Sequence, residues 1–201
     1  MVSGTSEKNT GRIRLGMVGG GQGAFIGAVH RLAARMDDHY DFVAGALSAE
    51  AKKAKASGEE LGLAAERIYT DFKEMAKSEA GRKDGIEAVA IVTPNHMHVP
   101  AAMAFIEHGI HVICDKPLAL SLREAKALEK LLARKKNVIF ALTHNYSGYP
   151  MIRQAKAMVA AGELGCVTAA IVVERADLAG FVVMRYADLE IGVEISESGL
   201  R

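Results

Sequence analysis

IRLGMVGGGQGA, residues 13–24, is the stretch that decides the fold of this chain. Its first six residues, Ile13 to Val18, are mostly apolar and predict a strand that ends at a run of glycines. Gly19, Gly21 and Ala24 match the spacing G-x-G-x-x-G/A, and a helical pattern follows at once. Glycines between a strand and a helix let a pyrophosphate approach the free N–H groups at the helix start. The stretch therefore predicts nucleotide binding, with a flexible glycine loop as the alternative.

Apolar runs and helical patterns alternate along the rest of the first 165 residues. Strands are predicted at Ile13–Val18, Tyr40–Leu47, Arg67–Tyr69, Ala88–Val92, His111–Cys114 and Val138–Leu142. Helices are predicted at Phe25–Met36, Ala49–Leu61, after Asp71, at Met97–His108, at Ser121–Arg134, where Ser121 and Glu124 form a capping box, and from about Met151 to Gly162. This alternation predicts an α/β fold of the Rossmann type, with a doubly wound parallel sheet covered on both faces.

The chain falls into three parts by character. Residues 1–12 are polar and predicted to be disordered, and residues 13–165 form the predicted dinucleotide-binding domain. Residues 166–201 have no obvious helix and are too few to enclose a core, so we expect the truncated start of a second, β-rich domain. Its predicted strands are Val167–Arg175, Phe181–Arg185 and Ile191–Ile195.

Composition excludes several classes of partner. The net charge is +1, from 25 basic and 24 acidic residues among 201, which gives no field to attract nucleic acid or an anionic membrane. Two cysteines, Cys114 and Cys166, cannot build a disulfide framework, and no apolar stretch is long enough for a signal peptide or a membrane span. We expect a cytoplasmic protein whose partners are small molecules or other protein chains.

A cation follows the apolar run His111–Cys114, in the segment Asp115-Lys116-Pro117. The carboxyl ends of parallel strands face the crevice where open α/β sheets bind ligands. We therefore expect Lys116 to meet a substrate or cofactor, with a solvated loop lysine as the alternative.

The end of the second predicted strand bears on cofactor choice. NAD-preferring sites usually place an acid there, but this strand ends in Ala46-Leu47-Ser48. Ser48 with Lys52 or Lys53 could bind a ribose 2′-phosphate, which favours NADP, although these lysines also fit an exposed helix face. Glu50 remains a candidate ribose ligand and keeps NAD open.

Segment 93–98, TPNHMH, follows the strand Ala88–Val92. Its two histidines invite a metal interpretation, but no Cys, Asp or Glu cluster accompanies them at ligand spacing, so no metal is expected. Asn95 can hydrogen-bond a ribose or carboxamide, and His98, in the first turn of a helix, is predicted to be structural.

Taken in order, these motifs resemble the Gfo/Idh/MocA family of NAD(P)-dependent oxidoreductases. The resemblance covers about Ile13 to Gly165 and includes Gly162-Glu163-Leu164-Gly165, which in the family leads out of the nucleotide domain. It implies that Lys116 is the active-site lysine, that the Lys116–Pro117 bond is cis, and that Asp115 stands where many relatives carry Glu. The implied cofactor-binding residues are Gly19, Gly21, Gln22, Phe25, Ile26, Ser48, Lys53, Thr93, Pro94, Asn95, His98, Asp115, Lys116, His144 and Asn145.

The resemblance implies hydride transfer between a nicotinamide and a sugar or polyol. Family members normally add a histidine from a second, substrate-binding and dimerisation domain as general acid/base, but no histidine follows His144 and the tail does not match the family pattern. Three hypotheses therefore stay open: an NADP- or NAD-dependent dehydrogenase, a non-catalytic nucleotide-binding module, and an S-adenosylmethionine-binding protein. Apolar surface left uncovered by the short tail predicts self-association.

Overall fold

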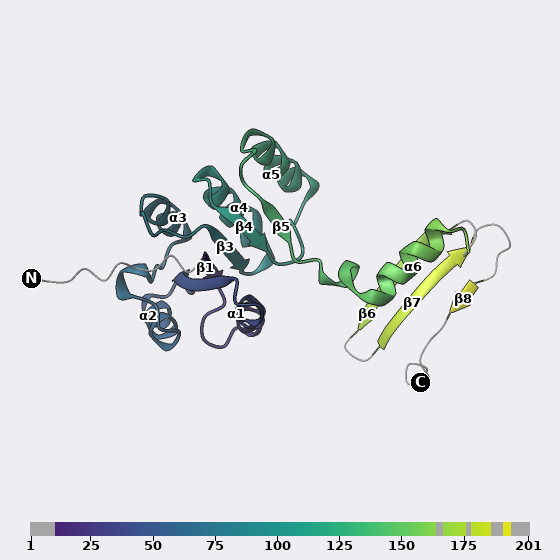
Figure 1. The fold of residues 1–201 in the computed structure, drawn as a ribbon, viewed down its shortest axis with the longest axis horizontal. Helices are drawn as coiled ribbons and strands as arrows, with labels where there is room; N and C mark the ends of the chain where they lie inside the picture. Colours follow the sequence, from purple (N-terminus) through teal and green to yellow (C-terminus); the bar gives the residue numbers. More distant parts are fainter. Residues whose placement is uncertain (1–10, 164–166, 176–177, 186–190, 194–201) are drawn as a thin grey trace, which may run out of the picture. The chain divides into compact units, whose positions relative to one another are not determined.

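The computed structural model describes residues 11–163, 167–175, 178–185 and 191–193. They belong to two compact units, the first ending at Thr143 and the second beginning at His144, and each unit is described by itself. The first unit holds a five-stranded parallel sheet in the order β2-β1-β3-β4-β5, with helices on both faces (Figure 1). Its strands are β1 (Ile13–Gly19), β2 (Tyr40–Ala46), β3 (Ala88–Val92), β4 (His111–Cys114) and β5 (Phe140–Leu142).

The helices of the first unit alternate with these strands. They are α1 (Phe25–Met36), α2 (Ala51–Glu60), α3 (Phe72–Ala80), α4 (His98–Glu107) and α5 (Leu122–Arg134), with short 3-10 turns η1 (Ala65–Arg67) and η2 (Asn95–Met97). β1 pairs in parallel with both β2 and β3, so the chain reverses its direction across the sheet beside β1. The predicted doubly wound Rossmann-type fold is confirmed, and ligands of such sheets bind at this switch point.

One predicted strand, Arg67–Tyr69, is wrong. The structure has η1 at Ala65–Arg67 instead, followed by a single parallel bridge between Ile68 and Gly45. The backbone N–H of Tyr69 donates to the carbonyl of Gly45 at 2.8 Å. The strand pairing does not extend beyond this bridge, because the side chains of Arg67 and Tyr69, on either side of it, belong to a buried polar cluster.

That cluster surrounds Glu79 of α3, which is only 1% exposed. Its carboxylate accepts hydrogen bonds from Arg67 Nε at 3.1 Å, from the Tyr69 hydroxyl at 2.9 Å and from the backbone N–H of Ile86 at 3.1 Å. Burial, reinforced by the hydrogen bond to Glu79, raises the pKa of Tyr69 to about 12. The hydrogen bonds of such a buried network strengthen one another, so the carboxylate and its partners stabilise the fold together.

We call the two sides of the sheet the α4 face, covered by α3, α4 and α5, and the α1 face, covered by α1 and α2 (Figure 1). The α4 face is closed by a continuous apolar core. Its fully buried members include Phe105 and Ile106 of α4 and Leu128 of α5, which pack with alternate strand residues. Alternation along the strands assigns the intervening residues to the other face.

The α1 face has a smaller core and an open part. Leu15 and Met17 of β1 pack there. Beside β5 the face is open, because Ile139 is 67% exposed and Phe140, its neighbour, turns toward the α4 face. The outer side of α1 carries four exposed apolar side chains at helical spacing, which we call the α1 stripe: Phe25, Val29, Leu32 and Met36.

The second unit begins with η3 (Asn145–Gly148) and α6 (Pro150–Ala160). It continues in an antiparallel sheet of β6 (Val167–Arg175), β7 (Leu178–Arg185) and β8 (Ile191–Val193). The strand predicted at 167–175 is confirmed, the one at 181–185 begins earlier, and the last is described only as far as Val193. The unit boundary before His144 lies ahead of α6, whereas the sequence analysis placed a domain boundary after Gly165.

Two expectations fall largely outside the described residues. Disorder was predicted for residues 1–12, of which only the last two are described. Cys166 is likewise not described. In the part of the chain that the structure does describe, no helix has the length and apolar character needed to cross a membrane.

Candidate functional site

The first turn of α1 is open to an anion. Its N-cap residue, Ala24, makes no side-chain capping bond, and no acidic residue lies in the first turn. Asp71 caps α3 and Ser121 caps α5 through their side chains, whereas α2, α4 and α6, like α1, have no side-chain cap. The start of α1 differs from these in the glycine loop that precedes it. Uncapped N–H groups and the helix dipole both favour negative charge at this position. The start of α1 therefore has the features of a phosphate site.

The glycine loop before α1 has a backbone that only glycine adopts easily. Gly19, Gly20 and Gly23 have φ angles of +81°, +73° and +77°. A Cβ atom at Gly21 would lie 2.7 Å from the carbonyl oxygen of Leu47, and one at Gly27 would lie 2.4 Å from the Gly20 Cα. The glycines thus let the loop pass close to both β2 and α1, as the sequence pattern predicts.

A cavity of about 540 Å³ opens beside this loop. It runs from the end of β1 to the ends of β2 and β3, which is the switch point of the sheet. The structure brings together around it these residues of the predicted site: Gly19, Gly21, Gln22, Ser48, Lys53, Thr93 and Pro94.

Thr93, directly after β3, is one of the residues that line this cavity, and it has an unused polar atom. Its Oγ1 is buried and has no hydrogen-bond partner among the described residues. Buried polar atoms are nearly always paired, so an orphan beside a cavity is suited to a ligand that supplies the partner. A ribose hydroxyl or a phosphate oxygen has the required chemistry.

The end of β2 presents no acid to the cavity. Ser48 and Lys53 line it, and the exposed Glu50 is not among the lining residues. The Ser48 Oγ accepts a hydrogen bond from the Glu50 backbone N–H at 3.1 Å, which fixes the hydroxyl at the strand end. This local arrangement suits a negatively charged group.

Asp115 and Lys116 follow β4, and Asp115 is held by several elements. Its backbone N–H donates to the Ile91 carbonyl of β3 at 2.9 Å, and its Oδ1 accepts from the Thr143 hydroxyl at 2.9 Å. The Oδ1 also lies 3.9 Å from His30 Nε2 of α1. Lys116 is exposed, and its bond to Pro117 is cis, as expected. The cation therefore projects from a well-anchored turn.

His98 is structural in the folded chain. It is 1% exposed, and its ring nitrogens lie 2.7 Å from the Pro117 carbonyl oxygen and 3.0 Å from the Thr93 carbonyl oxygen. Both nitrogens are therefore engaged within the protein. The ring ties the end of β3 to the Lys116 turn. Contact of His98 with a cofactor, which the resemblance implied, stays a prediction.

Three other predicted residues of the first unit are not among those that line the cavity. Phe25 is 82% exposed at the start of α1, while Ile26 packs toward the core of the α1 face. Asn95 is exposed in η2. His144 and Asn145 open the second unit, where the Asn145 amide donates to the Tyr149 hydroxyl at 3.3 Å.

Sequence reasoning missed three residues that shape the site. Ser57 of α2 accepts a hydrogen bond from the Gln22 backbone N–H at 3.0 Å, and Thr143 and His30 both meet Asp115. The only signal of these residues in the sequence is that each is polar and stands either on the side of a helix that faces the core or at the end of a strand. Such signals gain meaning only when the partner across the fold is known.

Two other chemistries have no support in the described part of the chain. No group of three His, Cys, Asp or Glu side chains comes together there as a metal site. Cys114 is a buried free thiol, and burial raises its pKa to about 12, so it is not poised as a nucleophile.

The glycine loop, the uncapped helix and the switch-point cavity define the class of dinucleotide-binding Rossmann domains. Residues 13–144 match the Gfo/Idh/MocA family, described as an oxidoreductase family with an NAD-binding Rossmann fold. The chain belongs to this family.

Several known proteins are similar to the chain. An oxidoreductase from Sinorhizobium meliloti is 63% identical, with a TM-score of 0.71 over 78% of this chain and 43% of that one. An inositol dehydrogenase homolog from Azotobacter vinelandii, complexed with NADH and myo-inositol, is 40% identical, with a TM-score of 0.73 over 79% and 41%. Levoglucosan dehydrogenase from Pseudarthrobacter phenanthrenivorans is 32% identical over 153 residues, or 76% of this chain and 38% of the relative. The chain thus spans between 38% and 43% of these three proteins.

Proposed function

We propose that this chain is the nucleotide-binding part of an NAD(P)-dependent oxidoreductase that transfers a hydride between a nicotinamide and a sugar or polyol. The observation that carries the proposal is the uncapped start of α1 beside a cavity lined by Thr93, whose buried hydroxyl has no partner among the described residues. A dinucleotide offers the pyrophosphate and the ribose hydroxyls that these two features need. NAD(P) would supply the hydride-accepting or hydride-donating ring.

The substrate class rests on the similar proteins. One is complexed with myo-inositol and another is a levoglucosan dehydrogenase, so both act on or bind polyhydroxylated rings. Lys116 is the residue that we propose for the catalytic role. Its ammonium group, carried at the end of β4, would donate a hydrogen bond to the reacting oxygen of such a ring and stabilise negative charge there.

Cofactor binding is tested by calorimetric titration of the purified chain with NADPH, NADH and S-adenosylmethionine in separate experiments. We expect both dinucleotides to bind and S-adenosylmethionine not to bind. Binding of S-adenosylmethionine alone would replace this proposal, and binding of none of the three would contradict it.

Catalysis is tested separately, with NADP or NAD and a panel of sugars and inositols. Turnover that is lost in Lys116→Ala supports the proposed role of Lys116, and turnover that persists removes it. Dinucleotide binding without turnover of any substrate favours the second candidate, a nucleotide-binding module.

NADP is the cofactor that we propose, because Ser48 and Lys53 line the cavity at the end of β2 and no acid does. Ser48→Asp places a carboxylate there, which would repel a 2′-phosphate and accept bonds from ribose hydroxyls. We expect the variant to weaken the binding of NADPH more than the binding of NADH. An equal effect on the two would contradict a 2′-phosphate site.

We also propose self-association of the chain, because the α1 stripe leaves large apolar side chains exposed. Sedimentation velocity over a range of concentrations tests this. A monomer at high concentration would contradict it.

A further inference from the structure

Two adjacent residues of α1, His30 and Arg31, contact opposite ends of the candidate site. We propose that they are positioning residues, with Arg31 fixing the glycine loop for the pyrophosphate and His30 fixing the Asp115-Lys116 end for the nicotinamide. The inference rests on the proposed function and deepens it, since it assigns how one helix holds both ends of the dinucleotide.

Arg31 reaches back from α1 to the glycine loop. Its Nη1 donates to the Gly20 carbonyl oxygen at 2.8 Å and lies 3.4 Å from the Met17 sulfur. In a trans peptide the carbonyl and the following N–H point in opposite directions. A Gly20 carbonyl held toward Arg31 therefore turns the Gly21 N–H the other way. Arg31 thus sets the direction of an N–H in the loop that lines the cavity.

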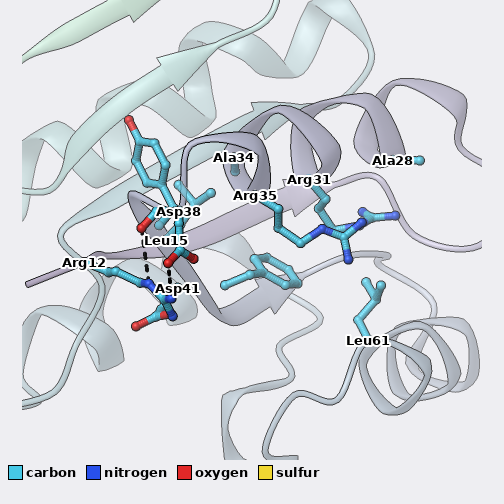
Figure 2. Close-up of a pocket in the computed structure, with 11 residues that line it drawn as sticks. Arg12, Leu15, Ala28, Arg31, Ala34, Arg35, Asp38, Asp41 and Leu61 are labelled. Atoms are coloured by element: carbon cyan, nitrogen blue, oxygen red, sulfur yellow. Dashed lines mark hydrogen bonds and ion pairs between the residues drawn. The ribbon is translucent and has the colours of Figure 1, made fainter. Parts of the chain in front are cut away.

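The surroundings of Arg31 partly bury its charge and place it beside a second guanidinium. Figure 2 shows Arg31 and Arg35 extending from α1 over a pocket of about 430 Å³ that Leu15 and Leu61 also line. Burial lowers the pKa of Arg31, the charge of Arg35 lowers it further, and Glu60 opposes both. A guanidinium kept beside a like charge and partly out of water is retained at a cost, which is consistent with a specific bond to the loop.

Glu60 joins this arrangement from α2. Its carboxylate accepts a hydrogen bond from the Gln22 side chain at 2.8 Å. The Ser57 hydroxyl, also on α2, accepts from the Gln22 backbone N–H at 3.0 Å. The loop is therefore bound on two sides, by Arg31 at Gly20 and by α2 at Gln22. Of these contacts, only Arg31 couples the loop to its own helix.

His30 meets the other end of the site. Its Nε2 lies 3.9 Å from Asp115 Oδ1, and the two side chains are 12% and 17% exposed. The same Oδ1 accepts a hydrogen bond from the Thr143 hydroxyl, directly after β5. Asp115 therefore has one neighbour at the end of β5 and another on α1. Burial lowers the pKa of His30, and the Asp115 charge opposes this shift. At 3.9 Å the imidazole lies beside the Asp115 carboxylate without a hydrogen bond, and its role in the proposal is to limit where this carboxylate, and with it the Lys116 turn, can move.

The experiment compares NADH with ADP-ribose, which carries the same pyrophosphate but lacks the nicotinamide. Affinities for both are measured by calorimetry on the wild-type chain, Arg31→Met and His30→Leu. Arg31→Met keeps a long side chain and removes the guanidinium N–H donors. We expect it to weaken the binding of both ligands about tenfold. His30→Leu is expected to weaken NADH at least about threefold and to leave ADP-ribose within about twofold.

Conservative variants separate positioning from folding. Arg31→Lys keeps a charge and His30→Gln keeps an N–H donor near the Nε2 position, so both should recover most of the lost affinity. Circular dichroism shows whether Arg31→Met and His30→Leu fold. If one of them does not, the affinities for NADH and ADP-ribose are compared on its conservative variant instead. Arg31→Lys must then affect the two ligands equally, and His30→Gln must affect NADH more than ADP-ribose.

Two results would overturn the inference alone. One is a folded Arg31→Met variant that binds both ligands as the wild type does. The other is a folded His30→Leu variant that weakens the binding of both ligands equally or of neither. A wild-type chain that binds neither ligand overturns the proposed function, and the inference with it.

Discussion

The two faces of the sheet differ in how completely their polar groups are hydrogen-bonded and their apolar side chains are buried. On the α4 face, Glu79 has three kinds of donor and Phe105 is fully buried. On the α1 face, the start of α1 is uncapped and Leu32 of the α1 stripe is 57% exposed. The cavity beside the glycine loop lies at the ends of the strands, is lined by residues of both faces, and includes Thr93 with its orphan hydroxyl. The α4 face thus has the larger buried core, and the features suited to binding lie at the strand ends beside α1.

The largest expected effect lies on the α4 face. Glu79→Ala would remove the buried partner of Arg67 and leave the partly exposed Asp84, 3.8 Å away, as its remaining carboxylate. Removing one partner of a buried pair costs about 3–5 kcal/mol. The free energy of unfolding, measured by urea titration with circular dichroism, should fall by that amount. Glu59→Ala is the control, because Glu59 pairs with Lys55 on the surface and such pairs contribute below about 1 kcal/mol. Equal losses in the two variants would remove the distinction.

A matched pair of leucines compares the two faces directly. Leu128 on α5 is 2% exposed and Leu32 on α1 is 57% exposed. Leu128→Ala should lower the free energy of unfolding by about 2–5 kcal/mol, since it leaves a cavity in the core. Leu32→Ala should change it by no more than about 0.5 kcal/mol. A large loss from Leu32→Ala would show that something covers the α1 stripe in solution.

Gly27→Ala affects the α1 face through shape. The new Cβ would lie 2.4 Å from the Gly20 Cα, so α1 and the glycine loop must move apart. We expect a loss of about 1–3 kcal/mol in unfolding free energy, together with the loss of measurable NADH binding in calorimetry. Gly81→Ala is the matched control, because its Cβ would make ordinary contacts at 3.6 Å. NADH binding that survives in Gly27→Ala would contradict the proposed place of the pyrophosphate.

The smallest expected effect is a pH dependence from His30. Its pKa is lowered in the folded chain from the ordinary 6.5, mainly by burial, so the unfolded chain binds the proton more readily. Its contribution to stability is therefore present above pH 6.5 and is lost as the pH falls through the lowered folded pKa. Unfolding free energies measured between pH 7 and 5 should fall less steeply in His30→Gln. Parallel curves for the two proteins would contradict this.

Local patterns predicted most of the fold, because β1, the glycine loop and α1 are specified by consecutive residues. The segment at Arg67–Tyr69 was predicted wrongly because its polar side chains meet Glu79, a partner that only the folded chain brings near. The same limit applies to the site. The glycine spacing indicated the loop, but the pairing of His30 with Asp115 joins α1 to the end of β4, and no spacing rule connects them.

The central place of β1 has a consequence for synthesis of the chain. β1 is made first among the strands, yet one of its two neighbours, β3, begins only at Ala88, and the Glu87 backbone N–H bonds to the Arg14 carbonyl at 2.8 Å. A ribosome must therefore add some seventy residues before that edge of β1 is paired, a non-local closure of the kind that slows folding. During that interval the nascent chain carries an apolar strand with one unpaired edge, which is the kind of surface that chaperones bind.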